Sequence, residues 1–494
     1  MTRILALDQG TTGSTALVID GSGAIVARAY DEFAQHYPRP GWVEHDAGEI
    51  RDVTFRVAGE ALDAAGIETP DAVGITNQRE TVVLWDRASG EPVTRAIVWQ
   101  DRRTADRCRA LKEEGREAWV RERTGLVLDP YFSATKLEWM LARDPDLRAR
   151  AQAGELAAGT VDSWLIWSLT AGAVHATDPT NASRTLLYDI GERAWSDELL
   201  DLFGVPAALL PEVRPSSGSF GRVAAGVPGA GAPIAGVAGD QQAALFGQGC
   251  WEPGRAKSTY GTGAFLLMHT GAERVASQHG LLTTVACDAR GEAAYALEGS
   301  IFIAGAAVQW LRDELGILED AAETEALAAA LDGNDGVYLV PAFAGLGAPH
   351  WEPDARGMIV GLTRGSGRAH LARAALEAMA YATREVVEAM EADAGERAPS
   401  LAVDGGASAN EWFARFLAST LGRPVLRAPQ IETTALGAAG LAGIAVGIWD
   451  DGDAFLSARR DFDRFEPEGD EAARARNWEG WTRAVEAAKA WARP

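Results

Sequence analysis

The chain has 494 residues and is short of positive charge, since 46 Lys and Arg residues stand against 70 Asp and Glu residues. Lysine is especially rare and occurs only at Lys112, Lys136, Lys257 and Lys489. Nucleic-acid backbones are held by clusters of Lys and Arg, and a net charge of −24 offers no such cluster. We therefore expect no nucleic-acid partner.

Cysteine and long apolar runs are also scarce. Cys108, Cys250 and Cys287 are far apart, which predicts free thiols in a reducing compartment rather than disulfides or a zinc site. The most apolar run, 435–449, consists mainly of Ala and Gly and is shorter than the roughly 20 residues that span a bilayer. It predicts a packed core helix. Because a strand pattern begins directly after the first residues, we expect no secretory signal, no membrane insertion and a cytoplasmic location.

The length exceeds what one hydrophobic core usually supports and predicts two large domains. The first half alternates short β-branched runs with Ala-rich helical stretches and includes the charged helical stretch 104–121, which is typical of an α/β fold. Helical spacing follows at 302–315, 371–390 and 411–421, and we expect Ser408 to cap the last of these. A new strand pattern begins at Arg255, so we predict domains at 1–249 and 250–494.

The first polar motif is Asp8-Gln9-Gly10-Thr11-Thr12-Gly13, directly after the apolar run 4–7. It combines a carboxylate that can reach hydrated Mg²⁺ with small residues whose N–H and hydroxyl groups can surround phosphate oxygens. Alone, it is equally compatible with an ordinary glycine-rich turn.

Comparable turns recur at 239–242 after the apolar run 234–238, at 260–263 after Lys257-Ser258-Thr259, and at 404–408 after the apolar run 401–403. Two strand–Asp–Gly turns near the starts of the two halves suggest a duplicated nucleotide-binding domain, with phosphate loops that face each other. Asn410 and Glu411 follow the last turn, which places it near a helix N-terminus, where anions are favoured.

Several ordered motifs together resemble the FGGY carbohydrate kinase family, and within it the branch that acts on glycerol. The motifs are Asp8–Thr12, Gly41–Asp46, Gly74–Thr81, Tyr131–Lys136, Gly239–Gln242, Gly345–Pro349 and Gly357–Glu377. The resemblance implies an actin/hexokinase-like α/β fold, in which two duplicated RNase H-like domains enclose a central active-site cleft. It implies the transfer of a phosphoryl group from ATP to glycerol, giving sn-glycerol 3-phosphate, as the first step of glycerol catabolism. Homodimers or homotetramers are common in the family.

The resemblance also assigns roles to residues. Those implied for glycerol are Arg79, Glu80, Trp99, Tyr131, Asp240, Gln241 and Phe265, with Asp240 as the general base. Those implied for ATP are Thr11, Thr12, Gly13, Gly261, Thr262, Gly305, Gln309, Gly406 and Asn410, with Asp8 holding Mg²⁺. Without the family, an adjacent Arg-Glu pair is more often a surface ion pair, and aromatic residues such as Trp99 and Phe265 are more often core packing.

One departure and two alternatives remain. Thr15 stands where the family commonly has an arginine, so one positive contact to the transferred phosphate is missing. The nearest alternative is an FGGY kinase for another small polyol or a pentulose, which needs more room than Trp99 and Phe265 would leave. The other is a nucleotide-dependent scaffold with the actin-like fold, since fold alone does not fix function. A scaffold has no need for the polar set around Arg79 and Asp240.

Overall fold

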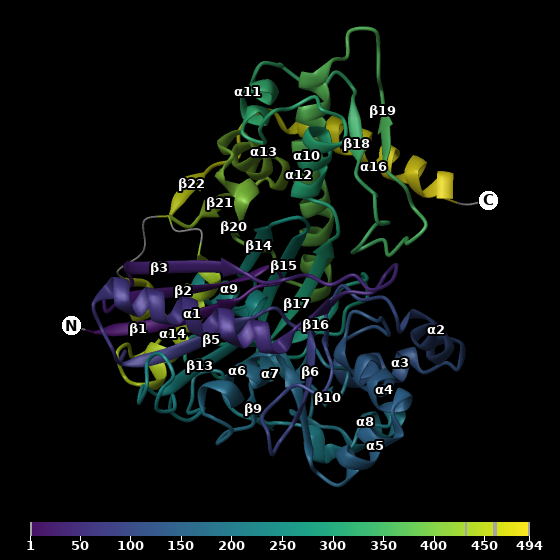
Figure 1. Ribbon diagram of the computed structural model, residues 1–494. Helices are drawn as coiled ribbons and strands as arrows, with labels where there is room; N and C mark the ends of the chain where they lie inside the picture. Colours follow the sequence, from purple (N-terminus) through teal and green to yellow (C-terminus); the bar gives the residue numbers. More distant parts are fainter. Residues whose placement is uncertain (1, 430–431, 458–461, 493–494) are drawn as a thin grey trace.

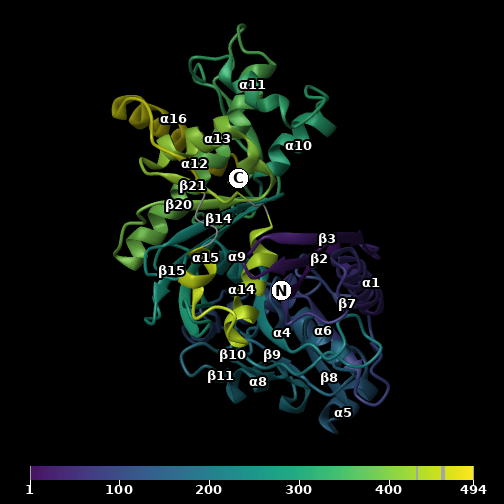
Figure 2. The same cartoon turned by 90° about the vertical axis from the view of Figure 1, so that its left-hand side faces the viewer.

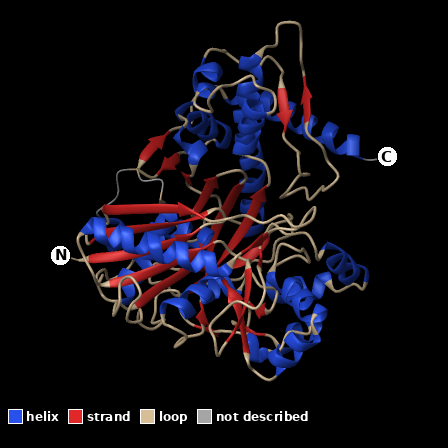
Figure 3. Ribbon diagram, viewed as in Figure 1, coloured by secondary structure: helices blue, strands red, loops and turns tan. Residues whose placement is uncertain are grey.

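A computed structural model describes residues 2–429, 432–457 and 462–492 of the chain (Figure 1). Helices and strands alternate throughout, and two large mixed sheets, one from each half, organise the molecule (Figure 3). The predicted α/β class is confirmed. The buried cysteines are free thiols, as expected. Among the described helices, none has both the length and the apolar character that crossing a bilayer requires.

The sheet of the first half has five strands in the order β13-β5-β1-β2-β3. Their bounds are β1 (Arg3–Gln9), β2 (Gly13–Asp20), β3 (Ile25–Glu32), β5 (Ala72–Asn77) and β13 (Ile234–Gly239). β5 runs parallel to both β1 and β13, and the last residues Gln9 and Gly239 are both paired with Asn77. The loops that follow these three strands therefore leave the same edge of the sheet.

Helices cover both faces of this sheet. α1 (Ala47–Ala65) begins at Asp46, whose carboxylate accepts from two backbone N–H groups, and packs on the face that carries Leu5 and Leu7. α14 (Thr433–Ala445) packs on the opposite face, with Ile4 and Ala6. α14 is the predicted core helix, and it is buried on all sides over most of its length. Although it comes from the second half of the chain, it lies beside the first-half strands (Figure 2).

The second half builds a seven-stranded sheet in the order β16-β17-β15-β14-β20-β21-β22. Its strands are β14 (Ala256–Tyr260), β15 (Ala264–Gly271), β16 (Leu282–Cys287), β17 (Ala293–Ile301), β20 (Leu401–Asp404), β21 (Val425–Arg427) and β22 (Asp463–Phe465). As in the first sheet, a strand pairs antiparallel with its successor and parallel with a later strand: β14 pairs with β15 and with β20. Between the two sheets, α9 (Asp240–Gly247) packs on α14 and on β14.

The predicted helices of the second half are present as α10 (Gly305–Asp313), α12 (Arg368–Ala394) and α13 (Glu411–Leu421). Ser408 is not the cap of α13. Asn410 takes that place by accepting from the N–H of Phe413, because a short 3₁₀ turn, η2 (Gly406–Ala409), uses the Ser408 hydroxyl to close on Gly405. The stretch 104–121 is two helices, α2 (Ala105–Glu113) and α3 (Glu117–Thr124), separated at Gly115.

Shorter elements complete the molecule. A four-stranded sheet contains β4 (Glu44–His45), β7 (Ala96–Ile97), β6 (Val82–Asp86) and β8 (Leu156–Thr160). Small pairs join β10 (Tyr188–Asp189) to β11 (Ala194–Trp195), β9 (Ala176–Thr177) to β12 (Glu212–Val213), and β18 (Tyr338–Val340) to β19 (Met358–Val360). The other helices are α4 (Ser133–Arg143), α5 (Pro145–Gln152), α6 (Val161–Leu169), α7 (Pro179–Ala182), α8 (Asp197–Phe203), η1 (Ala207–Leu209), α11 (Glu323–Ala329), α15 (Gly452–Ser457) and α16 (Glu471–Ala492).

Candidate active site

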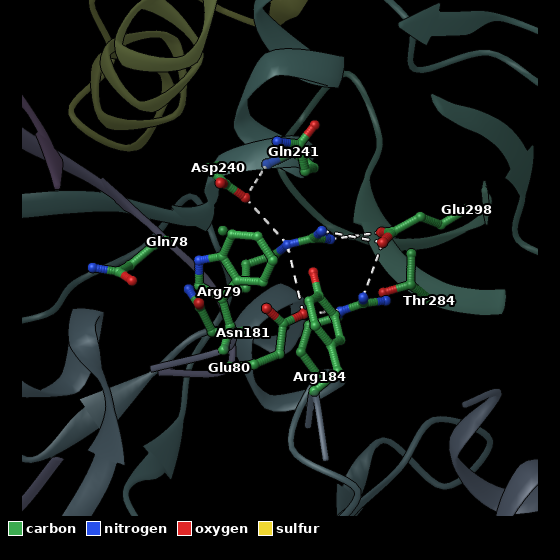
Figure 4. A network of polar contacts seen from close by, with 12 residues as sticks. Gln78, Arg79, Glu80, Asn181, Arg184, Asp240, Gln241, Thr284 and Glu298 are labelled. Carbon is green, nitrogen blue, oxygen red and sulfur yellow. Dashed lines mark hydrogen bonds and ion pairs between the residues drawn. The ribbon is translucent and has the colours of Figure 1, made fainter. Parts of the chain in front are cut away.

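The three loops at the shared edge of the first sheet carry the predicted site. Arg79 and Glu80 follow β5, and Asp240 is the first residue of α9, directly after β13. The Arg79 Nε lies 3.1 Å from the Asp240 Oδ1, and the backbone N–H of Gln241 donates to the same carboxylate at 2.7 Å (Figure 4). The structure therefore brings together four residues that the sequence predicted for glycerol.

Arg79 and Glu80 are buried, with side chains only 2% and 1% exposed, so the pair is not a surface ion pair. Glu80 has a φ of +62°, a left-handed conformation that is rare for a residue with a long side chain. The Ser133 hydroxyl donates to the Glu80 carbonyl at 3.0 Å and helps to hold this turn. Such conformations cost on the order of 1–3 kcal/mol and persist where the surrounding structure enforces them, often at functional sites.

Gly239 lets the Arg79 side chain pass close to β13. A Cβ at position 239 would lie 2.7 Å from Arg79 Cγ and 2.8 Å from Cδ, which is closer than real Cβ contacts allow. The small residue before Asp240 is thus required for the position of Arg79.

Sequence reasoning missed two charged residues of this cluster, Arg184 and Glu298. Arg184 follows α7, and its Nε donates to Glu80 Oε1 at 2.6 Å. Glu298 lies on β17 of the second sheet and accepts from Arg79 Nη1 at 2.6 Å and from Arg184 Nη2 at 2.9 Å. Burial alone would raise the pKa of Glu298, but the two guanidinium groups lower it to about 2. No local sequence signal marks either residue.

Three aromatic side chains form a half-buried group beside these charges. The rings of Trp99 and Tyr131 are 5.5 Å apart, and those of Trp99 and Phe265 are 6.5 Å apart, in edge-to-face arrangements. Phe265 comes from β15 of the second sheet, whereas the other two come from the first half. The predicted apolar wall is therefore assembled from both halves.

Lys257 joins the second sheet to the same site. Its buried ammonium contacts the side-chain oxygen of Gln241 and donates to Thr259 Oγ1 at 2.9 Å and to the Phe265 carbonyl at 3.4 Å. Burial lowers the pKa of Lys257 to about 8, while Asp404 and Asp240 oppose the shift. Two predicted substrate contacts, Gln241 and Phe265, are thus tied to one lysine.

The first phosphate turn is closed by a hydrogen bond of 2.9 Å from the N–H of Gly10 to the carbonyl of Gly13. Thr12 is exposed and Thr11 is half-buried, so both can approach a ligand. Gly13 is buried as the first residue of β2, where a Cβ would lie 2.6 Å from the Asp31 carbonyl. The turn therefore presents its two threonines rather than Gly13.

Asp8 lies at the end of β1, and its surroundings suit a cation. Burial and the neighbouring carboxylates of Asp240 and Glu432 raise its pKa to about 8, because negative charge accumulates there. Mg²⁺ is typically held by one or two carboxylates together with phosphate oxygens and water. Thr15 is the residue paired with Asp8 across β1 and β2, so the position of the missing arginine lies directly beside this carboxylate.

The predicted nucleotide residues of the second half form another group. The N–H of Gly305 donates to the Gly261 carbonyl at 3.0 Å, and the N–H of Ala306 donates to the Thr262 carbonyl at 3.1 Å. Gly405 has a φ of +83° and packs on Tyr260, so the turn with Gly406 lies against the same strand end. Between described residues, no backbone hydrogen bond joins this group to the Thr11-Thr12 turn.

Two further predicted residues lie at the edges of this group. Gln309 is exposed, about one turn beyond Gly305 on α10. Asn410 both caps α13 and donates to Thr324 Oγ1 at 3.2 Å. Its side chain therefore already has structural partners, whereas Gln309 is open to a ligand.

Strands of both sheets end in polar turns, and a buried Arg-Glu pair lies beside the Asp240 carboxylate. This arrangement defines a phosphoryl-transfer enzyme of the sugar-kinase class. Comparison with known proteins specifies the family. Residues 3–247 match the N-terminal domain of the FGGY family of carbohydrate kinases, and residues 256–446 match its C-terminal domain. The chain belongs to the FGGY family of carbohydrate kinases.

The similarity to known relatives extends over nearly the full length of the chain. The chain is 58% identical to the glycerol kinase of Alkalilimnicola ehrlichii (100% of this chain, 99% of the relative) and 55% identical to that of Deinococcus radiodurans (99% and 98%). A crystal structure of Plasmodium falciparum glycerol kinase with ADP is 36% identical, with a TM-score of 0.93 and coverage of 99% and 98%. A xylulose kinase from Lactobacillus acidophilus, 19% identical with a TM-score of 0.88 and coverage of 100% and 99%, shares the fold.

Proposed function

We propose that this enzyme phosphorylates glycerol with ATP, giving ADP and sn-glycerol 3-phosphate. The observation that carries the proposal is the buried Arg79-Glu80 pair beside Asp240, together with the aromatic group of Trp99, Tyr131 and Phe265. A donor, an acceptor, a carboxylate base and an apolar wall are what a three-carbon triol requires. The full-length relatives named glycerol kinase support this substrate.

The glycerol hydroxyls divide between these groups. Arg79 donates to one hydroxyl and Glu80 accepts from a neighbouring one, while Trp99 and Phe265 face the carbon atoms. The third hydroxyl lies at Asp240. Because Asp240 is held by Arg79 and by the N–H of Gln241, its carboxylate has a fixed direction.

In the reaction, the oxygen of this third hydroxyl forms a bond to the γ-phosphorus of ATP as the bond to the β–γ bridging oxygen breaks. The hydroxyl proton passes to Asp240, and ADP is the leaving group. Since phosphoryl transfer proceeds through a loose transition state, alignment and charge neutralisation contribute more than the base. General base catalysis typically adds about 10²–10⁴-fold.

For the nucleotide, we propose that Thr11 and Thr12 contact the β- and γ-phosphates from the first half, and Gly261 and Thr262 from the second. Gly305, Gln309, Gly406 and Asn410 would border the nucleoside. Asp8 would hold Mg²⁺, mainly through water, and the ion neutralises phosphate charge when it is bound. Gly13 would support this turn from within β2.

We also propose the wider organisation that the sequence predicted. The domains are 1–249 and 250–494, a division that falls between the end of α9 and the start of β14, and they close over the substrates to exclude water. The enzyme is a cytoplasmic homodimer or homotetramer. Its place is the first step of glycerol catabolism.

The test is ADP release with Mg-ATP and a panel of glycerol, dihydroxyacetone, xylulose, ribulose and gluconate, with Asp240→Asn as the control. Turnover of glycerol well above that of the others, lost in the variant, supports the proposal. Preferred turnover of a pentulose would overturn the glycerol assignment and retain the kinase. A lack of turnover with every polyol would overturn both.

A further inference from the structure

Glu298 brings a carboxylate from the second sheet to Arg79. It is fully buried on β17 and accepts from both terminal nitrogens of Arg79, at 2.6 Å from Nη1 and at 3.1 Å from Nη2. Paired hydrogen bonds between a guanidinium and a carboxylate fix the plane of the arginine as well as its position. Nη1 also donates a hydrogen bond of 3.2 Å to Gln242 Oε1.

Arg184 extends this contact to Glu80. Its Nε donates to Glu80 Oε1 and its Nη2 donates to Glu298 Oε1, so it bridges the two carboxylates (Figure 4). The other terminal nitrogen, Nη1, is buried without a hydrogen-bond partner among the described residues. The orientation of Arg184 therefore depends on Glu80 and Glu298.

Together, Arg79, Glu298, Arg184 and Glu80 form a chain of alternating charge, which we call the buried tetrad. All four side chains are at most 2% exposed, and their formal charges cancel. A buried charge that loses its partner is strongly unfavourable, so each member depends on the others. The tetrad is held by both halves of the chain, since Glu298 comes from the second sheet and the other three members from the first half.

The hydrogen bonds within the tetrad determine which polar atoms of Arg79 and Glu80 can bind a substrate. Nη1 of Arg79 is occupied by Glu298 and Gln242, one N–H of Nη2 by Glu298, and Nε faces Asp240. Among the described residues, one N–H of Nη2 has no hydrogen-bond partner. On Glu80, Oε1 is occupied by Arg184, and Oε2 has no hydrogen-bond partner within the same part of the chain. A single donor and a single acceptor oxygen, each with a fixed direction, suit two neighbouring hydroxyl groups.

We propose that Glu298 and Arg184 are positioning residues of the polyol site, which hold Arg79 and Glu80 so that one N–H and one carboxylate oxygen face the substrate. This inference rests on the proposed function of the same site. It adds that the second half of the chain contributes to polyol recognition through a residue that does not touch the polyol.

The test compares Glu298→Gln and Arg184→Lys with the unmodified enzyme in steady-state kinetics. Gln keeps an acceptor oxygen at nearly the same shape but loses the charge, and Lys cannot donate to two carboxylates in the geometry of a guanidinium. Small misplacements of positioning groups cost up to about 100-fold. We expect kcat/KM for glycerol to fall about 10- to 100-fold, with the KM for glycerol raised and the KM for ATP within about 3-fold.

Glu377→Gln is the matched control. Glu377 is also a buried glutamate with an arginine partner, Arg373, at 2.7 Å, and it lies on α12, where it accepts from Asn334 and Tyr381 rather than from the site. We expect a comparable decrease in melting temperature and no selective change in the KM for glycerol. The effect of Glu298→Gln on glycerol is thereby separated from a general loss of stability.

Several results would overturn the inference. They are an unchanged KM for glycerol in both tetrad variants, equal changes in the KM for glycerol and for ATP, or the same change in Glu377→Gln. If Glu298→Gln does not fold, Arg184→Lys decides alone. If the unmodified enzyme prefers another polyol, the proposed function fails, and the same comparison with that polyol still decides the role of the tetrad.

Discussion

The indole Nε1 of Trp99 donates a hydrogen bond to Thr11 Oγ1 at 2.9 Å. This hydrogen bond joins Trp99 of the proposed polyol wall directly to Thr11 of the proposed phosphate turn. The backbone N–H of Trp99 donates to Thr81 Oγ1, and that hydroxyl donates to Gln78, whose amide donates to the Gly10 carbonyl at 3.1 Å. The loop with Arg79 and the turn with Thr11 are therefore connected through two separate routes.

Loss of the Trp99–Thr11 hydrogen bond should affect both substrates. In Thr11→Val the acceptor is removed at nearly constant volume, and the indole N–H loses its partner. We expect the KM values for glycerol and ATP to rise together, by about 10-fold or less, since a hydrogen bond contributes about 0.5–1.5 kcal/mol. Trp99→Phe should cost less in the Thr11→Val background than in the unmodified enzyme, as a double-mutant cycle measures.

Thr12→Val provides the comparison for this prediction. Thr12 is exposed on the same turn and makes no hydrogen bond to Trp99 among the described residues. We expect Thr12→Val to raise the KM for ATP and to leave the KM for glycerol unchanged. If both threonine variants changed only the KM for ATP, the connection between the turn and the wall would have no functional consequence.

Asp240→Asn should leave binding largely intact and remove proton acceptance. The side chain is 31% exposed, so the substitution does not bury an unpaired group. We expect kcat to fall by about 10²–10⁴-fold, the range of general base catalysis. Glycerol binding, followed by calorimetry, should stay within about 10-fold. A kcat within about 10-fold of the unmodified enzyme would exclude Asp240 as the base.

The strand ends of the site could be predicted from the sequence because each one is a local pattern. An apolar run followed by Asp and Gly marks the end of a buried strand, and parallel pairing brings Gln9, Asn77 and Gly239 to one edge. The family resemblance then placed Arg79 and Asp240 in one site, and the structure puts them 3.1 Å apart.

The partners of these residues could not be predicted in the same way. Glu298 lies 219 residues from Arg79 along the chain, and Arg184 lies 104 residues from Glu80. Which charge pairs with which depends on how the two sheets pack, and no local pattern records that. The predicted cap of α13 was wrong for a smaller reason: a 3₁₀ turn uses the Ser408 hydroxyl before the helix begins, so Asn410 is the cap.

Because the pKa of Asp8 is raised in the folded state, the free energy of unfolding should depend on pH when Mg²⁺ and nucleotide are absent. Its pKa rises from 3.8 to about 8, so the folded state binds a proton that the unfolded state releases. Stability from this proton is present at low pH and is lost as the pH rises from about 4 to about 8. Asn at this position is neutral throughout and should remove the dependence.

We therefore expect Asp8→Asn to melt higher than the unmodified enzyme with EDTA present, and the difference to grow from about pH 5 to about pH 8. A pKa difference of one unit corresponds to about 1.4 kcal/mol, so the gain should exceed about 1 kcal/mol at about pH 8. The same variant should lose kinase activity, since the proposed Mg²⁺ carboxylate is absent. Parallel melting curves for both proteins across this pH range would contradict the argument.

Gly239→Ala tests whether the position of Arg79 depends on the absence of a side chain before Asp240. The added Cβ would overlap the Arg79 stem at 2.7–2.8 Å, so either Arg79 or β13 must move. Overpacking in a tight interior costs about 1–3 kcal/mol of stability. Because Arg79 contacts both Glu298 and Asp240, its displacement should also disturb these two carboxylates. We expect kcat/KM for glycerol to fall about 10-fold or more, the scale of the effect of misplaced positioning groups.

Gly365→Ala is the control, since its Cβ would meet only Thr363 Oγ1 at 3.7 Å, an ordinary contact. If Gly239→Ala and Gly365→Ala had equal kinetics, the stem of Arg79 would have room that the structure denies it, and the geometry of the tetrad would need revision.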